Sequence, residues 1–380
     1  MASPLPLADL RVIDLSTVVA GPNCARYLAD FGADVIKVEN PDGGDTMRNL
    51  AWRDPRDGEG MWWKLVNRNK RTIALDLKDP ADLEVLLGLV DDAHVVVENF
   101  RPGTLERLGL GPDVLLQRAP QLVLTRVTGF GQTGPYRSRP GFATIAESMS
   151  GYAAISGSPD GQPLLPPIAL TDEITGLAAA LATMIALHSG VGQVVDVSLI
   201  ESLLQLMSPL VTLYGLTGEL QPRMGAGLPY TVPRGTYRCA DGEWVGVSTS
   251  SDSVARRVLE VLGAADDPRF TTFAERMRHR AELEQIMVAW CAARPRQEVL
   301  DTFTAAEAAI GPVMTMADIA EDPHYAARNA IIEVDGTPMQ GLIAKLSATP
   351  GAVRWAGRAI DADGAEIRAD GWTTRRDELS

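Results

Sequence analysis

The chain has 380 residues, with 35 Lys and Arg against 49 Asp and Glu, so its formal charge is −14. Hydrophobic residues make up 46% of the sequence and charged residues 22%, which is typical of a globular protein and excludes a disordered chain. The acidic balance argues against nonspecific binding to nucleic acid or to an anionic membrane, because both need an excess of Lys and Arg. We therefore expect roughly two or three domains and a small molecule as the partner.

The cysteines and the N-terminal residues bear on the compartment. Three cysteines, at positions 24, 239 and 291, lie far apart. An odd, scattered set fits neither a disulfide framework nor a Cys-x-x-Cys metal motif, so we expect a cytoplasmic protein without a metal site. Residues 1–10 contain Asp9 and no Lys or Arg, unlike a secretion signal.

The first third of the chain alternates short apolar segments with segments of helical periodicity. We expect strands at 10–15, 34–38, 72–75, 94–98 and 122–127, and helices at 22–31, 80–90 and 113–118. Short β-branched strands that alternate with helices are typical of a parallel sheet with helices on both faces. The sequence therefore predicts an α/β fold for this part of the chain.

The middle of the chain begins with its longest uncharged run, residues 174–195. Glycines and His188 interrupt this run, so we interpret it as a buried helix followed by a strand rather than as a membrane span. The predicted elements are a helix at 171–187, a strand at 193–198 and a second apolar helix at 200–216.

The remaining third has a different character. Residues 218–234 are rich in Gly, Pro and Arg and predict a linker, and residues 235–248 predict a hairpin with an Asp-Gly turn. We also expect charge-rich helices at 253–308 and strands at 331–334 and 341–346. The predicted organisation is a large domain beginning at 1–217, a linker at 218–234, a smaller α+β domain at 235–325 and a C-terminal segment at 326–380.

Residues 129–134 read Gly-Phe-Gly-Gln-Thr-Gly, a literal G-x-G-x-x-G directly after a predicted strand. A dinucleotide site needs this motif to open a long helix, so that a pyrophosphate meets the N–H groups at the helix start. Pro135, Pro140 and Gly141 interrupt that stretch. We therefore interpret the motif as a Gly-rich loop.

Positive charge is concentrated in one part of this acidic chain. The residues are Lys64, Arg68, Lys70 and Arg71, followed by Lys78, Arg101 and Arg107. Such a group suits a phosphate ligand, and a solvated basic face is the ordinary alternative. No aromatic pattern accompanies these residues, which disfavours nucleic acid as the source of the phosphate.

Asp172 stands at the start of the predicted Ala-rich helix, four residues before Gly176. An Asp at that position typically caps a helix by accepting a hydrogen bond from an N–H of the first turn. The positive end of the helix also favours the ionised carboxylate, which can attack an activated acyl carbon. The capping role and the nucleophilic role both stay open, and they are compatible.

Several stretches resemble one known family in the same order along most of the chain. They read VVAGP at 18–22, GADVIKVE at 32–39, NRNKR at 67–71, ALDLK at 74–78, ENFRPG at 98–103, GFGQTGPY at 129–136, RPGF at 139–142, GPV at 311–313 and SATP at 347–350. The chain resembles the family III CoA-transferases of the CaiB/BaiF type, which include formyl-CoA:oxalate and carnitine CoA-transferases. The methylacyl-CoA racemases are relatives of that family.

The resemblance implies a fold, an activity and a site. It implies a Rossmann-like large domain completed by the C-terminal segment, a smaller α+β domain, and a homodimer of interlocked chains. Asp172 would attack the donor thioester to give a mixed anhydride and then an aspartyl-CoA thioester, and an acceptor carboxylate would reverse these steps. CoA and acyl-CoA would be substrates rather than tightly bound cofactors. The implied CoA contacts are Val19 and Ala20 at the first strand–helix turn, Leu75 near the adenine, Lys78 and Arg107 at the phosphates, and Arg139.

The sequence departs from the family pattern at several places, one of which is a terminal Leu-Gly-Glu-His segment that is replaced around residues 360–363. Asn40 stands where relatives often have a basic residue, and residues 225–227 lack a common Gly-Asn pair. The racemase branch has a His directly after Arg-x-Gly, whereas this chain has Phe142, which cannot accept a proton. We therefore expect a CoA-transferase, with a CoA-ester racemase or isomerase and a noncatalytic CoA-binding protein as the alternatives.

Overall fold

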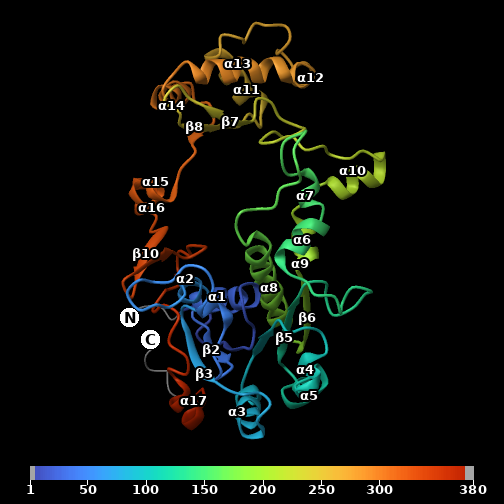
Figure 1. Cartoon of the computed structure of the whole chain (residues 1–380), viewed down its shortest axis with the longest axis vertical. Helices are drawn as coiled ribbons and strands as arrows, with labels where there is room; N and C mark the ends of the chain where they lie inside the picture. Colours follow the sequence, from blue (N-terminus) through green and yellow to red (C-terminus); the bar gives the residue numbers. More distant parts are fainter. Residues whose placement is uncertain (1–4, 373–380) are drawn as a thin grey trace. The chain divides into compact units, whose positions relative to one another are not determined.

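The computed structural model describes residues 5–372 and has an α/β fold built on a six-stranded sheet (Figure 1). All neighbouring strands are parallel, in the order β3-β2-β1-β4-β5-β6. This order is that of Rossmann-like folds, so the predicted fold class is confirmed. The strands are β1 (Arg11–Asp14), β2 (Asp34–Glu39), β3 (Lys70–Ala74), β4 (Val95–Glu98), β5 (Val123–Thr128) and β6 (Gln193–Ser198).

Helices cover both faces of this sheet because successive strand residues point to opposite sides. Ile13 and Ile36 belong to one core, whereas their neighbours Val12 and Val35 belong to the other. The first core is covered by α3 (Pro80–Asp91), α4 (Thr104–Arg107), α5 (Pro112–Arg118) and α17 (Gly364–Asp370). The second core is covered by α1 (Ala20–Asp30), α6 (Ala143–Met149), α8 (Leu170–Ser189) and α9 (Leu199–Gln205).

Helix α8 is long and apolar enough to cross a membrane by length and composition, and α9 with the next helix passes as a bent pair. Core helices pass the same test. Helix α8 packs against α1 and β5, and its buried residues include Ala179 and Thr183. The interpretation of this run as a core helix followed by a strand is confirmed, since β6 comes next.

Two predicted elements are wrong. The helix predicted at 200–216 is divided into α9 and α10 (Leu210–Thr217), whose axes differ by 77°. Ser208, with φ of 51°, and Pro209 break it, because Pro cannot supply a helical N–H. The strand predicted at 341–346 does not form; instead β10 (Ile331–Val334) pairs with β11 (Thr337–Gln340) in an antiparallel hairpin.

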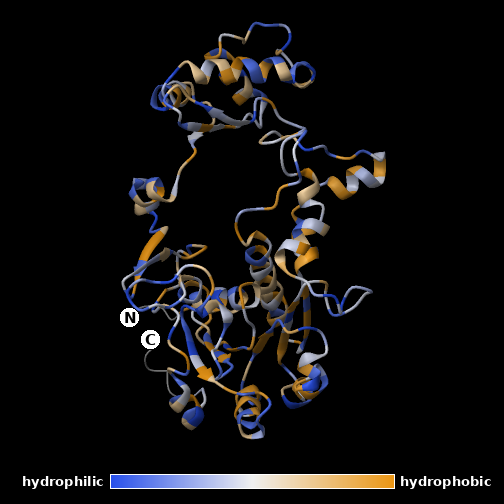
Figure 2. Cartoon of the chain, viewed as in Figure 1, coloured by the Kyte–Doolittle hydropathy of each residue, from blue (hydrophilic) through white to orange (hydrophobic). Residues whose placement is uncertain are grey.

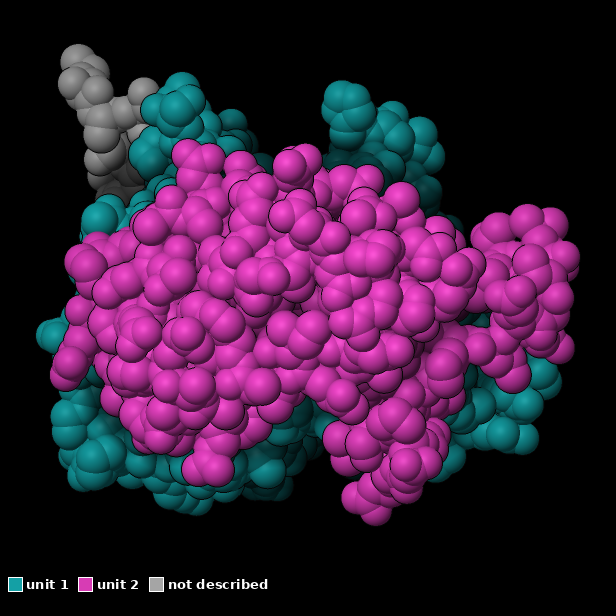
Figure 3. All heavy atoms as spheres, turned by 90° about the horizontal axis from the view of Figure 1, so that it is seen from above, with its two compact units in different colours: residues 1–152, 165–208, 325–380 teal, residues 153–164, 209–324 magenta. Residues whose placement is uncertain are grey.

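The chain divides into two compact units, coloured separately in Figure 3. Of the described residues, the first unit contains 5–152, 165–208 and 325–372, and the second contains 153–164 and 209–324. This division differs from the predicted boundaries, which placed 153–164 and 209–217 in the large domain. Residues 153–164 belong to the second unit because Gly225 N donates to Gly157 O (2.8 Å) and Arg223 donates to Ser158 O and Gly161 O.

The second unit is a small α+β assembly. Its antiparallel sheet of β7 (Gly235–Arg238), β8 (Trp244–Val247) and β9 (Ile310–Pro312) includes the predicted hairpin. This sheet packs against helices through a core that contains Val245, Met287 and Phe303. Its main helices are α11 (Asp252–Val261), α12 (Phe273–Arg278), α13 (Arg280–Ala292) and α14 (Arg296–Ala305).

Several short helices complete the chain. They are η1 (Thr46–Arg48), α2 (Met61–Val66), α7 (Tyr152–Ile155), α15 (Met316–Glu321) and α16 (Pro323–Ala327).

Candidate functional site

The carboxyl ends of β1 and β4 lie side by side where the strand order of the sheet reverses. Open α/β sheets bind ligands in the crevice outside that point. Asn99, which follows β4, accepts a hydrogen bond from Thr17 N (2.8 Å) and donates one to Thr17 O (2.6 Å) in the loop after β1. This pair of hydrogen bonds joins the two loops, and Thr17 lines both cavities of the first unit described next.

The first cavity has a volume of about 230 Å³ and contains Asp172. Val19 and Ala20 of the turn between β1 and α1 line it, together with Phe142. Three arginines also line it, and none of them has a carboxylate partner among the residues the structure describes. They are Arg101, Arg137 and Arg139, the last of which stacks on the Tyr136 ring at 3.8 Å.

The second cavity adjoins the first, because Thr17 and Phe100 line both. It has a volume of about 260 Å³ and is lined by Leu75, Lys78 and Thr104. Arg107 lies beside it, since its Nη2 donates to Thr104 Oγ1 (2.7 Å). Lys78 and Arg107 are exposed and, within residues 5–372, have no carboxylate partner.

Asp172 lies in the first turn of α8 but does not cap it. The cap residue is Ala169, and no side chain supplies a cap hydrogen bond. The capping prediction is therefore wrong, because the helix begins two residues earlier than the Asp. Burial, together with the negative charges of Glu147 and Glu173, raises the pKa of Asp172 to about 6. The pKa is therefore raised rather than lowered, because burial and like charge outweigh the favourable effect of the helix end.

Gly176 sets the spacing between α8 and α1. A Cβ atom at this position would lie 2.7 Å from Asn23 Cβ and 3.0 Å from Ala20 O. Such distances are too short for a side chain, so only Gly permits this close approach of the two helices. Because Asp172 lies one turn before Gly176, the approach brings Asp172 into one cavity with the turn that begins α1.

The basic cluster at 64–71 is neither a phosphate site nor a solvated face. Each of its four cations is buried and paired with an Asp, so both interpretations are wrong for these residues. Their partners come before them in sequence but meet them only in the folded chain. The pairs are Lys64–Asp54 (2.6 Å), Arg68–Asp30 (2.6 Å), Lys70–Asp14 (2.8 Å) and Arg71–Asp34 (2.6 Å).

Buried lysines also hold the loop after β1 and the first turn of α1. Lys70 Nζ donates to Pro22 O (2.8 Å), and Lys37 Nζ donates to Ser16 O. The conformation that they hold is unusual, because Val18 has φ of 69°, which a β-branched residue rarely adopts. The cluster therefore shapes the cavity from inside the protein rather than binding a ligand itself.

The Gly-rich motif at 129–134 forms a loop, as predicted, and no helix follows until α6 begins at Ala143. Gln132 N donates to Asp196 Oδ2 (2.9 Å), which ties the loop to β6. A Cβ atom on Gly129 would lie 2.6 Å from Gly141 Cα, so the two backbones cross in direct contact. This crossing directs residues 137–142 back to the cavity of Asp172.

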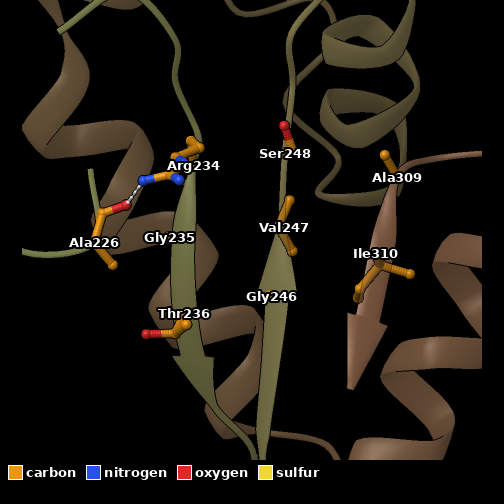
Figure 4. Close-up of a pocket in the computed structure, with 9 residues that line it drawn as sticks. All are labelled: Ala226, Arg234, Gly235, Thr236, Gly246, Val247, Ser248, Ala309 and Ile310. Carbon is orange, nitrogen blue, oxygen red and sulfur yellow. Dashed lines mark hydrogen bonds between the residues drawn. The ribbon is translucent and has the colours of Figure 1, made fainter. Parts of the chain in front are cut away.

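A separate cavity of about 650 Å³ lies in the second unit, on the sheet of β7, β8 and β9 (Figure 4). Arg234 is its one charged lining residue, and its Nη1 donates to the carbonyl oxygen of Ala226. Thr236 and Ser248 supply hydroxyl groups. No carboxylate or thiol from the described part of the chain lines this cavity, in contrast to the first cavity, which contains Asp172.

All six residues that the resemblance implies as CoA contacts lie in or beside the two cavities of the first unit. Val19, Ala20 and Arg139 line the cavity of Asp172, Leu75 and Lys78 line the adjoining cavity, and Arg107 lies beside it. The sequence interpretation missed Arg137 and Glu147. Arg137 lies two residues before Arg139 in the same loop, which is a signal that was available; no motif marks Glu147.

Comparison with known proteins gives consistent results. A family model described as CoA-transferase family III matches residues 7–363. The chain is 40% identical to succinyl-CoA–D-citramalate CoA-transferase of Chloroflexus aurantiacus, over 99% of this chain and 96% of that protein. It is 35% identical to succinate–glutarate CoA-transferase of Agrobacterium fabrum, over 89% and 88%. The crystal structure of a CaiB/BaiF family protein from Brucella suis matches all of both chains with a TM-score of 0.87 at 30% identity.

Proposed function

The chain belongs to CoA-transferase family III and is a CoA-transferase, and from this premise we propose that Asp172 is its nucleophile. An oxygen of the Asp172 carboxylate attacks the thioester carbon of the donor, a C–O bond forms, the C–S bond breaks, and CoA leaves as a thiolate. The thiolate then attacks the Asp172 carbon of the mixed anhydride, which gives an aspartyl-CoA thioester and releases the donor acid. The acceptor carboxylate then goes through these steps in reverse. The enzyme-bound intermediates therefore conserve the free energy of the thioester bond.

One observation carries this proposal. Among the described residues that line the first cavity, Asp172 is the one carboxylate, and it shares that cavity with the turn between β1 and α1 and with unpaired arginines. A carboxylate whose pKa is raised to about 6 is a stronger nucleophile than an ordinary Asp and is still mostly ionised at neutral pH. The arginines can hold anionic groups of the substrates.

The two adjoining cavities suggest how CoA binds. We place the thioester end beside Asp172, with Val19 and Ala20 at the turn and Arg139 at the edge of the first cavity. The adenine lies near buried Leu75 in the second cavity, and Lys78 and Arg107 hold the phosphates. The support is that both cations are exposed and unpaired in the described chain, in contrast to the buried cations at 64–71.

The substrates that we propose are succinyl-CoA or a similar acyl-CoA as donor and a small dicarboxylic acid as acceptor. Two relatives are named for succinate or succinyl-CoA and for citramalate or glutarate, which are all dicarboxylic acids. The arginines of the first cavity suit a second carboxylate. The three cysteines are free and buried, which supports a reducing cytoplasm as the compartment.

Racemisation at the α-carbon is the alternative activity of this family's relatives. Phe142 lines the cavity of Asp172 at the position where the racemase branch has its His. A phenyl ring cannot exchange a proton, so a two-base racemisation through this position has no second base. The absence of α-proton exchange in deuterated water, together with CoA transfer, would separate the two activities.

Mass spectrometry of the peptide that contains Asp172 tests the proposal. The enzyme is incubated with succinyl-CoA and digested at low pH, and Asp172→Asn and Glu173→Gln are treated in parallel. We expect an adduct of CoA minus water on Asp172 in the wild type and in Glu173→Gln, and none in Asp172→Asn. If wild type binds CoA but never carries the adduct with any dicarboxylyl-CoA donor, the covalent route is wrong.

A further inference from the structure

Glu147 is a buried carboxylate that differs from every other one in the described chain. Among the described residues, eight Asp and Glu residues are buried, and seven of these are paired with Lys or Arg within 4.0 Å. Glu147, only 3% exposed, has no such partner among residues 5–372. The paired residues are Asp14, Asp30, Glu39, Asp45, Asp54, Glu98 and Asp363. Burying a carboxylate without a cation is energetically unfavourable, so we expect Glu147 to have a role that offsets this cost.

The position of Glu147 next to the first turn of α8 indicates what this role is. It lies on α6, which packs against the first turn of α8. Thr171 Oγ1, which is fully buried, donates a hydrogen bond to Glu147 Oε1 (3.2 Å). Thr171 directly precedes Asp172, so this hydrogen bond fixes the Glu147 carboxyl group beside the turn that carries the nucleophile. The two carboxyl groups interact, because the charge of Glu147 is a cause of the raised pKa of Asp172.

We propose that Glu147 is a positioning residue whose negative charge destabilises the free Asp172 carboxylate and thereby favours the covalent forms of Asp172. This inference rests on the proposed role of Asp172 as nucleophile. When Asp172 attacks, its charge passes to the departing CoA thiolate, and when the thiolate attacks the anhydride, the charge leaves with the released acid. In the aspartyl-CoA thioester Asp172 is neutral, so Glu147 no longer repels it.

Protonation and acylation of Asp172 have the same electrostatic consequence. Both remove the negative charge that Glu147 repels, so one repulsion energy determines both equilibria. A loss of the repulsion that lowers the titration midpoint of Asp172 by one pH unit therefore lowers the equilibrium constant for the covalent form about tenfold. This quantitative link distinguishes a role in electrostatics from a role in packing.

The other charged groups around α8 do not take this role. Glu173, on α8 itself, is partly exposed to solvent, which screens its charge. The arginines of the first cavity are exposed and do not contribute to the raised pKa of Asp172. Charged residues on the other elements that pack against α8 have partners of their own. These are Arg26 on α1 over the Tyr27 ring, Arg126 on β5 with Glu98 and Glu106, Asp196 on β6 with Gln132 N, and Glu201 on α9, whose carboxylate accepts a hydrogen bond from Ser198 Oγ.

The variant Glu147→Gln isolates the charge. Glutamine has nearly the same shape and still offers an oxygen to Thr171, but it carries no charge. We expect the acid limb of the pH–rate profile to move down by roughly one pH unit and the ratio of aspartyl-CoA enzyme to free enzyme to fall about tenfold. Glu147→Asp keeps the charge and leaves the acid limb near its wild-type position. Ser148→Ala, on the exposed side of the same helix, changes neither.

Each outcome bears on the proposal. Removing an unpaired buried charge stabilises a protein, so Glu147→Gln should melt at a higher temperature than wild type, and failure to fold would contradict the proposal. If Glu147→Gln does not move the acid limb, or if Glu147→Gln and Glu147→Asp move it equally, the proposed role of Glu147 is wrong. The proposed role of Asp172 as nucleophile would be unaffected by either result. If wild type itself forms no adduct on Asp172, the proposed function fails instead.

Discussion

The pKa of Asp172 has a consequence for stability as well as for catalysis. An Asp in the unfolded chain loses its proton near pH 3.9, whereas burial and the charges of Glu147 and Glu173 raise the pKa of Asp172 to about 6 in the folded enzyme. Between these values the folded state binds more protons than the unfolded state. The free energy of unfolding therefore falls as pH rises through this window, and the loss persists above it.

Asp172→Asn removes this charge and should stabilise the enzyme. We expect its free energy of unfolding to exceed that of wild type by about 1–3 kcal/mol at pH 8 and by little at pH 4. Urea denaturation of both proteins at the two pH values measures the difference. A difference in unfolding free energy that is equal at both pH values would show that the pKa of Asp172 is not raised in the folded enzyme.

Lys78 and Arg107 are the exposed cations that we assign to the phosphates of CoA. A hydrogen bond to a charged group contributes about 1.5–3 kcal/mol, so removing either side chain should raise KM for succinyl-CoA at least about tenfold. Steady-state kinetics of Lys78→Ala and Arg107→Ala measure this change. The control is the succinyl thioester of pantetheine, which lacks the phosphates of the nucleotide and should be used equally by wild type and variants. An equal loss with both thioesters would contradict the assignment.

At the scale of elements, the contact between α1 and α8 sets the distance between the nucleophile and the CoA-binding turn. Gly176→Ala would place a Cβ 3.0 Å from Ala20 O, and the two helices must separate to accept it. We expect a loss of about 1–3 kcal/mol in stability and a larger fractional loss in kcat/KM, because Asp172 moves relative to the turn. Gly88→Ala is the matched control, since no atom of residues 5–372 outside the local helix lies within 4 Å of a Cβ at that helical position. Equal effects of both substitutions on kcat/KM would refute this interpretation.

The elements that were predicted correctly from the sequence are those with a clear pattern of hydrophobic residues. Short segments rich in β-branched residues identified the strands of the sheet. Residues 171–187 are helical as predicted, and many of the buried residues of this helix are small. The failures have local causes. Pro209 divides a run whose hydrophobicity is continuous, and the turn at Asp335 and Gly336 places a strand before residue 341.

The candidate site was predictable only in part. Asp172 and the residues of the strand–helix turns follow sequence motifs, and the structure brings them to adjoining cavities. The partners of Lys70 and Arg68 were not predictable, because ion pairs between distant strands form only when the sheet does. The burial of Glu147 likewise depends on how α6 packs against α8, which no periodicity reveals.

At the scale of the whole molecule, we propose a homodimer. Helix α8 exposes Leu181 (64%) and Ile185 (62%), and an apolar cavity of about 370 Å³ lies between this helix, Tyr27 and Ile343. Helix α10 contains no buried residue although it is largely apolar (Figure 2). Exposed apolar surfaces of this kind typically mark protein interfaces.

The mass in solution tests this proposal. Light scattering after size-exclusion chromatography should give twice the chain mass of 40.7 kDa. Leu181→Glu should shift the protein toward monomer, because it places a charge within the apolar surface. Val114→Glu, on α5 in the same unit, should leave the dimer unchanged. A stable wild-type monomer would rule the dimer out.

The central claim is that Asp172 exchanges an oxygen atom with the acid that it transfers to CoA. When an acceptor carboxylate attacks the aspartyl-CoA thioester, one of its oxygens bridges the anhydride, and it remains on Asp172 when CoA attacks the acceptor carbon. We would therefore run the reaction with an acceptor labelled with oxygen-18 and measure the mass of the peptide that contains Asp172. We predict that oxygen-18 enters Asp172 during turnover and no other carboxylate of the enzyme. Transfer of CoA to the labelled acid with an unlabelled Asp172 would contradict the account.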